Sequence, residues 1–223
     1  MRTAILYSSG KDSTMTLWHC KQQGHDVACL LSLLPENPDS YMFQKPVRAL
    51  LERQAEALGL PILFRTTRGE KEVELEDLRA LLQRAKEERD VECIASGALA
   101  SDYQYARINR LCADLGLETF APLWHKDQEQ HMREVLAAGF DVRMTRIAAD
   151  GLSKEWLGRR LAMDDVDALG ALHKRLGINI AGEGGEFETI VLDGPMFKRP
   201  VRIAYDIIME SECRGELRIT EVN

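Results

Sequence analysis

The stretch TAILYSSGKDSTMTLWHCKQQ, residues 3–23, decides the fold. Its first five residues form a short, mainly apolar run typical of a buried strand, and residues 14–23 have helical character. The turn between them consists of small and charged side chains: Ser8, Ser9, Gly10, Lys11, Asp12 and Ser13. In an open α/β sheet, ligands bind beyond the carboxyl ends of the strands. A binding site is therefore expected at this turn.

Strand and helix patterns continue to alternate through residue 125. Further strands are predicted at residues 27–34, 61–64, 91–96 and 118–120. Helices are predicted at residues 46–59, 73–89 and 102–115, and the first of them has Gly59 at its end, where glycine is favoured. This alternation predicts an α/β domain with a parallel sheet flanked by helices, similar to a Rossmann fold.

From residue 126 onward the pattern changes. Helices are predicted at residues 128–138 and 164–176, and strands at 141–148, 186–192, 201–209 and 216–220, with a glycine-rich segment at 182–194. The sequence thus predicts two domains, an α/β domain of residues 1–125 and a smaller α+β domain of residues 126–223.

Charge and composition exclude several classes of protein. The chain has 223 residues, of which 45% are apolar, and a net charge of −7. Residues 1–125 hold 15 basic and 18 acidic residues, and residues 126–223 hold 14 and 18, so neither half is basic. Direct binding of naked nucleic acid is not expected from such a surface. No apolar run is long enough for a membrane span. Five cysteines without a CxxC pair indicate a reducing, cytoplasmic location.

The turn at residues 8–13 has the chemistry of a phosphate site. Small residues leave backbone N–H groups accessible, and the following helix adds the positive end of its dipole. Lys11 can neutralise phosphate charge, the serine hydroxyls can donate hydrogen bonds, and Asp12 can hold Mg²⁺. The alternative is an ordinary strand–helix turn in which Asp12 or Ser13 caps the helix. The turn lacks the spacing of a Walker A motif.

Two further segments carry candidate residues. Gly97, Ser101, Asp102 and Arg107 follow the strand at 91–96, so we expect them at the same edge of the sheet as the first turn. The segment GEGGEFET places Glu183, Gly184, Gly185, Glu186 and Glu188 together. Such a concentration of carboxylates is compatible with a metal, a cationic substrate, or a hairpin with a solvated acidic face.

The turn resembles the S-G-G-x-D-S fingerprint of the PP-loop ATP pyrophosphatases, with Ser9 in place of the first glycine. Across the chain, SSGKDS, SDYQxxR, PLWHKDQ, LSKEWLGRRL and GEGGEFET followed by DGPMFKRP are together similar to the diphthine–ammonia ligase (diphthamide synthase) family, in a short, archaeal-type form. The resemblance implies an ATP-binding domain of the HUP type at residues 1–125 and a substrate-recognition domain at residues 126–223.

The resemblance also implies an activity. Family members use ATP and ammonium to convert diphthine, a modified histidine on translation elongation factor 2, into diphthamide through an acyl-adenylate, with release of AMP and pyrophosphate. It implies catalytic roles for Lys11, Asp12 and Ser13, with Mg²⁺ near Asp12. The implied ATP-binding residues are Tyr7, Ser8, Ser9, Gly10, Lys11, Asp12, Ser13, Gly97, Ser101, Asp102 and Arg107. The implied substrate-binding residues are Tyr103, Gln104, Glu183, Gly184, Gly185, Glu186 and Glu188.

The trimethylammonium group of diphthine gives the acidic segment a role in attracting a cation. Cation–π faces are available from Tyr103, Trp124, Trp156 or Phe187. Two other functions stay open at this point. One is another PP-loop adenylating enzyme, such as a tRNA-modifying one, which the acidic charge disfavours. The other is a non-catalytic nucleotide-binding protein of the HUP type, which the intact Lys11-Asp12-Ser13 disfavours. The oligomeric state is undecided, and a homodimer is one option.

Overall fold

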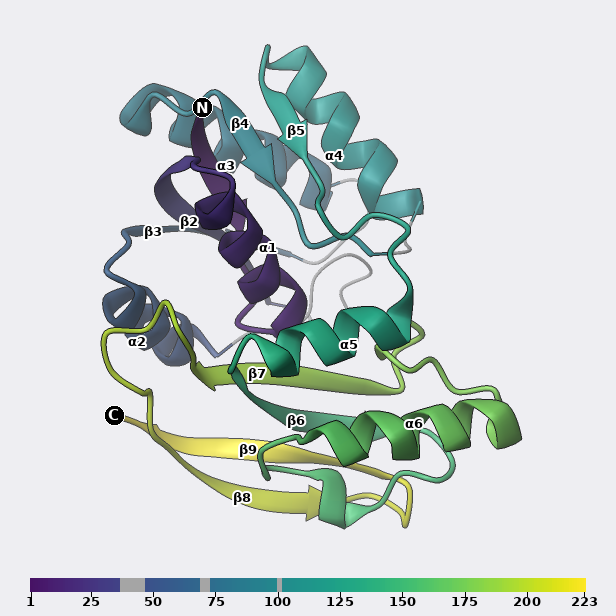
Figure 1. Cartoon of the computed structure of the whole chain (residues 1–223). Helices are drawn as coiled ribbons and strands as arrows, with labels where there is room; N and C mark the ends of the chain where they lie inside the picture. Colours follow the sequence, from purple (N-terminus) through teal and green to yellow (C-terminus); the bar gives the residue numbers. More distant parts are fainter. Residues whose placement is uncertain (37–46, 69–72, 100–101) are drawn as a thin grey trace. The chain divides into compact units, whose positions relative to one another are not determined.

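The computed structural model describes residues 1–36, 47–68, 73–99 and 102–223, which divide into two compact units, Met1–Trp124 and His125–Asn223 (Figure 1). The first unit has the order β1 (Arg2–Leu6), α1 (Lys11–Gln22), β2 (Asp26–Pro35), α2 (Arg48–Leu58), β3 (Ile62–Thr67), α3 (Val73–Arg89), β4 (Cys93–Ala95), α4 (Asp102–Asp114) and β5 (Glu118–Phe120). All paired neighbours in its sheet run parallel. The predicted α/β fold class is confirmed.

The strand order of this sheet, β3-β2-β1-β4-β5, determines where a ligand can bind. The chain moves outward from β1 in one direction to β2 and β3, and then returns to the other side of β1 to form β4 and β5. The connections therefore diverge between β1 and β4, and in folds of this kind ligands bind at the carboxyl ends of two such strands. The turn at residues 8–13 and the segment after β4 both begin at this point.

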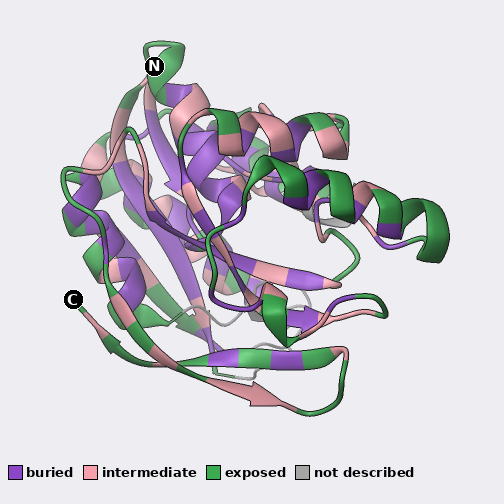
Figure 2. Ribbon diagram, turned by 60° about the horizontal axis from the view of Figure 1, so that its bottom comes forward, coloured by how far each residue is buried: buried purple, intermediate pink, exposed green. Residues whose placement is uncertain are grey.

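Helices cover both faces of the five-stranded sheet. One buried cluster joins the sheet to α3 and α4; its members include Ala4, Leu31, Leu63, Leu78, Leu82, Ile94, Ile108 and Cys112. Thr3 and Ile5, also fully buried, alternate with Ala4 along β1 and so point to the opposite face, and α1 packs against β1, β2 and β4. The central strands β1, β2 and β4 are mostly buried (Figure 2), as expected of a parallel sheet covered on both faces.

The second unit is an antiparallel sheet with two helices. Its elements are α5 (Gln128–Ala137), β6 (Asp141–Ala148), the single-turn 3₁₀ helix η1 (Lys154–Trp156), α6 (Met163–Leu176), β7 (Phe187–Asp193), β8 (Ile203–Met209) and β9 (Arg214–Val222), and the strand order is β7-β6-β9-β8. α5 and α6 contact each other and lie over the sheet (Figure 1). Asp127 caps α5 by accepting a hydrogen bond from the Gln130 N–H at 2.8 Å.

An ion pair fixes the start of α6. The guanidinium of Arg159 donates two hydrogen bonds to the Asp165 carboxylate, at 2.5 and 2.7 Å, and the Ala162 N–H donates a third at 2.7 Å. Burial opposes ionisation of Asp165, but the hydrogen bonds from Arg159 and Ala162 outweigh it and hold the pKa of this carboxyl below its usual value. The LSKEWLGRRL segment thus has a structural role at this helix.

Every helix and strand predicted from the sequence is present, and the differences lie at their ends. α1 begins at Lys11 rather than residue 14, so half of the polar turn is the first turn of the helix. β4 is shorter than predicted because its pairing with β1 begins only at Cys93. The predicted start of the second helix, Pro46, lies outside the described residues, whereas Gly59 closes that helix as expected, with a φ of 69°. Among the described residues, no helix is long and apolar enough to cross a membrane.

Candidate active site

The turn after β1 leads directly into the first turn of a helix, whose N–H groups point toward the carboxyl end of the strand. α1 begins at Lys11, and its N-cap residue, Gly10, has an extended conformation and provides no side-chain cap. The first helical hydrogen bond runs from the Thr14 N–H to the Gly10 carbonyl at 3.1 Å. The N–H groups of Lys11, Asp12 and Ser13 therefore have no partner within the helix. An anion at the carboxyl end of β1 can accept hydrogen bonds from them.

The hydroxyl of Ser13 connects the two sides of the turn. It donates to the Gly10 carbonyl at 3.1 Å and accepts from the Ser8 N–H at 3.2 Å, and its oxygen lies 3.3 Å from the Ser8 hydroxyl oxygen. Ser13 is buried and Ser8 is exposed. The sequence predicted Ser13 as a direct ligand, and its contacts give it in addition a role in closing the turn.

Lys11 and Asp12 place two opposite charges at the helix start. The ammonium of Lys11 donates to Asp12 Oδ2 at 2.9 Å, and Lys11 is only 4% exposed. A buried cation needs an anionic partner, because water no longer solvates it. The Lys11 ammonium is therefore suited to bind a phosphate oxygen that approaches the turn.

The backbone at Ser9 has a conformation that side chains seldom adopt. Its φ is 72°, in the left-handed region that favours glycine. The family fingerprint has glycine at this position, and this chain uses a buried serine. The Ser9 carbonyl accepts a hydrogen bond at 3.2 Å from Nε2 of Gln54, a fully buried residue of α2. The sequence analysis missed Gln54, although a polar residue between Leu50, Leu51 and Leu58 on an apolar helix face is a visible signal.

Gly97 brings the segment after β4 against the turn. A Cβ atom at Gly97 would lie 2.9 Å from the Asp12 carbonyl carbon and 3.0 Å from the Ser13 nitrogen. Only glycine fits between these backbones without movement. The family resemblance implies Gly97 as an ATP-binding residue, and in the structure it gives room for the turn itself.

Of the other residues implied to bind ATP, the structure describes Tyr7, Asp102 and Arg107 but not Ser101. The Tyr7 phenol is buried, lies 3.2 Å from the Thr14 hydroxyl and has a raised pKa because of its burial. It therefore supports the start of α1 from within the core. Asp102 begins α4 and Arg107 lies in its second turn. Ser101 lies outside the described residues, as do the side chains of Tyr103 and Gln104.

In the second unit, the Glu186 carboxylate binds its own loop. It accepts hydrogen bonds at 2.9 Å from the N–H groups of Asn179 and Gly184. Gly184 permits this contact, since a Cβ atom there would lie 2.6 Å from Glu186 Oε1. β7 begins one residue later than predicted, at Phe187. The Glu186 side chain turns back toward its own loop, and its two hydrogen bonds brace that loop.

Glu188 belongs instead to a row of charges across three strands. Arg146 of β6 pairs with Glu188 of β7 at 3.4 Å, and Glu216 of β9 is its register partner on the other side. Burial raises the pKa of Glu188, and the guanidinium of Arg146 counteracts this effect. Glu183 and Gly185 are exposed at the tip of the loop.

The aromatic residues considered for a cation site have structural partners where they are described. Trp124 stacks on Tyr105 with ring centroids 4.0 Å apart, and the Trp156 ring faces the Arg159 guanidinium at 5.1 Å. Phe187 is buried. The two tryptophan rings thus each have a neighbour within their own unit.

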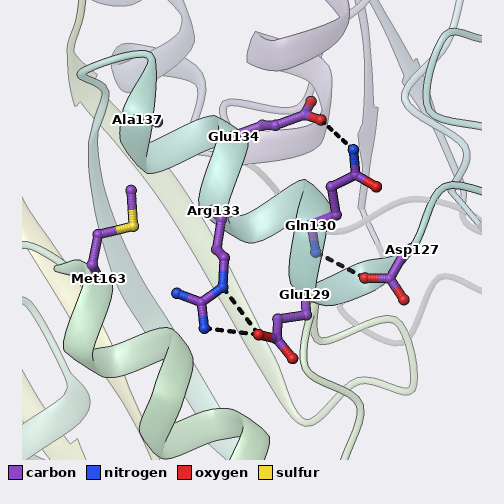
Figure 3. A pocket seen from close by; sticks show the side chains of 7 residues that line it. All are labelled: Asp127, Glu129, Gln130, Arg133, Glu134, Ala137 and Met163. Carbon is purple, nitrogen blue, oxygen red and sulfur yellow. Dashed lines mark hydrogen bonds and ion pairs between the residues drawn. The ribbon is translucent and has the colours of Figure 1, made fainter.

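A groove along α5 is lined by Asp127, Glu129, Gln130, Arg133, Glu134, Ala137 and Met163 (Figure 3). Several of its charges are paired. Arg133 binds Glu129 at 2.7 Å, and two residues outside the lining, Asp167 of α6 and Lys126, bind Arg133 and Glu134. The groove contains no side-chain arrangement suited to nucleotide chemistry.

Comparisons with known proteins agree with the motifs. The Diphthamide synthase N-terminal domain matches residues 1–119, and the Diphthamide synthase C-terminal domain matches residues 127–222. Diphthine–ammonia ligase of Danio rerio is 36% identical over all of this chain and 96% of its own length, and that of Homo sapiens is 38% identical over 90% of this chain and 82% of its own length.

The comparisons also include a longer relative and a distant structure. Diphthine–ammonia ligase of Schizosaccharomyces pombe is 35% identical over 94% of this chain, which corresponds to 37% of the yeast protein. A crystal structure titled as a predicted subunit of tRNA methyltransferase from Methanocaldococcus jannaschii is 17% identical, with a TM-score of 0.48 over 87% of this chain and 98% of its own, and adds nothing to the fold described above. Both halves of the chain match in order and over nearly their full length, and the chain therefore belongs to the diphthine–ammonia ligase family.

Proposed function

We propose that this protein is an ATP-dependent carbon–nitrogen ligase that joins ammonium to the carboxylate of diphthine on translation elongation factor 2, giving diphthamide, AMP and pyrophosphate. The observation that carries the proposal is the β1–α1 turn, with its three N–H groups and the buried Lys11 at the divergence point of the sheet. These are the groups that binding and cleavage of ATP between its α- and β-phosphates require.

The reaction needs ATP because a carboxylate is a poor electrophile. Attack of a diphthine carboxylate oxygen on the α-phosphorus forms an acyl-adenylate and breaks the bond to pyrophosphate. Ammonia then attacks the acyl carbon, loses a proton, and AMP leaves. Negative charge grows on the pyrophosphate in the first step. The N–H groups of Lys11, Asp12 and Ser13 and the Lys11 ammonium are suited to stabilise that charge.

Mg²⁺ is part of the proposal, and Asp12 is the residue that would hold it. Among the residues that the structure describes, no group of three or more His, Cys, Asp or Glu side chains could hold a metal by itself. A single partly exposed carboxylate fits Mg²⁺, which commonly binds one or two carboxylates, several waters and the substrate's own phosphates. When bound, the ion would neutralise phosphate charge.

We assign the elongation factor to the second unit. The exposed Glu183 and the row of Glu188, Arg146 and Glu216 together hold three carboxylates and one guanidinium, so their net charge is −2. Such a surface favours the trimethylammonium group of diphthine. The Glu186 carboxylate accepts two hydrogen bonds from its own loop, so we assign it a role in holding the loop. A cytoplasmic location follows from a substrate that acts in translation.

The test measures pyrophosphate release from ATP with ammonium and diphthine-bearing elongation factor 2. Release should require all three substrates, and mass spectrometry should find diphthamide on the factor. Glu183→Gln should raise the KM for the elongation factor and leave the KM for ATP unchanged. Release that occurs with tRNA and not with the elongation factor would instead identify a tRNA-modifying enzyme, a function that the acidic charge of both halves disfavours.

A further inference from the structure

Gln54 of α2 holds the backbone of the phosphate turn from outside the turn's own sequence. Its side chain is fully buried, and its Nε2 lies 3.2 Å from the carbonyl oxygen of Ser9, 45 residues away in the chain. A carbonyl oxygen can only accept a hydrogen bond, so the amide group of Gln54 must present its NH₂ to Ser9.

This contact fixes the orientation of one peptide plane. The peptide bond between Ser9 and Gly10 is planar and trans, so its N–H points opposite to its C=O. Because the Ser9 carbonyl points to α2, the Gly10 N–H points away from α2. Rotation of this plane would break the bond to Gln54 and leave a buried carbonyl without it, which is costly.

The hydrogen bond from Gln54 matters because Ser9 has a left-handed backbone conformation. A non-glycine residue in the left-handed region is less stable than in its usual conformation, so a turn with serine here tends toward other geometries. Glycine would adopt the same φ without help. The hydrogen bond from Gln54 compensates for the presence of serine where the family fingerprint has glycine.

We infer that Gln54 is a positioning residue for ATP, holding Ser9 in its left-handed conformation so that the turn is ready to bind the phosphates. This inference rests on the proposed function, because it assumes that the turn binds ATP. Loss of the contact lowers the fraction of molecules whose turn can bind ATP. The apparent Kd for ATP rises in inverse proportion to that fraction.

The test is a double-mutant cycle on the full chain, with ATP binding measured by calorimetry in the presence of Mg²⁺. Gln54→Met keeps the volume of the side chain and removes the donor. We expect it to raise the Kd for ATP about three- to tenfold, the equivalent of one hydrogen bond. In turnover assays the KM for ATP should rise with little change in kcat. In a Ser9→Gly background, Gln54→Met should change the Kd less than twofold.

Leu82→Val in α3 serves as the matched control, since Leu82 is fully buried in the cluster that joins the sheet to α3 and α4, and no residue of the turn belongs to that cluster. It should lower the melting temperature and leave the Kd unchanged. The inference is overturned if Gln54→Met binds ATP as wild type does, or if it weakens binding equally in both backgrounds. If Gln54→Met does not fold, folding of the Ser9→Gly/Gln54→Met double variant supports the inference and its failure to fold overturns it. A wild-type chain that does not bind ATP would instead refute the proposed function.

Discussion

Substitution of Gly97 by alanine tests the packing of the phosphate turn against the segment after β4. The added methyl group would lie 2.9, 3.0 and 3.1 Å from the carbonyl carbon of Asp12, the nitrogen of Ser13 and the carbonyl oxygen of Asp12. Contacts between non-bonded heavy atoms are favourable only from about 3.5 Å. The two backbones must therefore separate by about half an ångström. Gly97 is not in the left-handed region, so the cost is steric and not conformational.

The size of the effect follows from this displacement. Overpacking a well-packed interior costs about 1–3 kcal/mol of folding free energy. Displacing a catalytic group by about 1 Å can reduce the rate about a hundredfold. For half that displacement, we expect kcat/KM for ATP to fall about tenfold, together with a weaker affinity for ATP. Pyrophosphate release measures the first quantity, calorimetry the second, and urea denaturation the stability.

Gly170→Ala is the matched control for this experiment. Gly170 lies inside α6, and the nearest neighbour of an added Cβ atom is a side-chain oxygen at 4.0 Å. Alanine there should stabilise the protein by about 0.5–1 kcal/mol and leave kcat/KM unchanged. A Gly97→Ala enzyme with wild-type kcat/KM would refute the steric reasoning. A loss of activity with unchanged affinity for ATP would show that the segment after β4 acts on something other than the phosphate turn.

Three further variants test individual side chains. Lys11→Met should reduce ATP-dependent pyrophosphate release about a hundredfold or more while circular dichroism shows a folded chain; release within tenfold of wild type would exclude the role given to this ammonium. Asp165→Asn should lower the free energy of unfolding by about 1–2 kcal/mol at neutral pH. Because Arg159 helps hold the pKa of Asp165 below its usual value, that difference should disappear as the pH falls below about 4, and a difference independent of pH would contradict the assignment. Glu186→Gln keeps one of two acceptors and should destabilise the protein by about 1–3 kcal/mol in urea denaturation; unchanged stability with weaker binding of the elongation factor would return Glu186 to the substrate site.

The sequence was sufficient to predict the fold because each element has a local signal. The period of the apolar residues distinguishes strands from helices, and Gly59 marks a helix end. The predicted helix at 73–89 and the strands at 118–120 and 141–148 agree with α3, β5 and β6 to the residue. The start of α1 was placed too late, because a phosphate turn continues directly into its helix and Lys11-Asp12-Ser13 belongs to both.

The contacts that support the site could not be predicted in the same way, because they join segments far apart in the chain. Gly97 is visible in the sequence as a small residue after a strand, yet its neighbour is Asp12, on the adjacent strand's turn. Glu186 looks like one of several clustered acids, and only the loop geometry shows that its carboxylate is used by backbone N–H groups. A carboxylate that is needed to hold its own loop has the same sequence signature as one that binds a cation.

The sheet order explains why these supporting contacts come from the places they do. β1 has β2 on one side and β4 on the other, so the segments that follow those strands end up beside the turn that follows β1. α2, which follows β2, supplies Gln54 to the Ser9 carbonyl, and the segment after β4 supplies Gly97 to the Asp12–Ser13 peptide. The turn is thereby held at both its ends by its two neighbours in the sheet. A turn with the same six residues but without these neighbours would lose both constraints, and the serine at position 9 would then favour a different backbone conformation. The six-residue motif is therefore only part of the proposed phosphate site, and the strand order supplies the contacts that hold it.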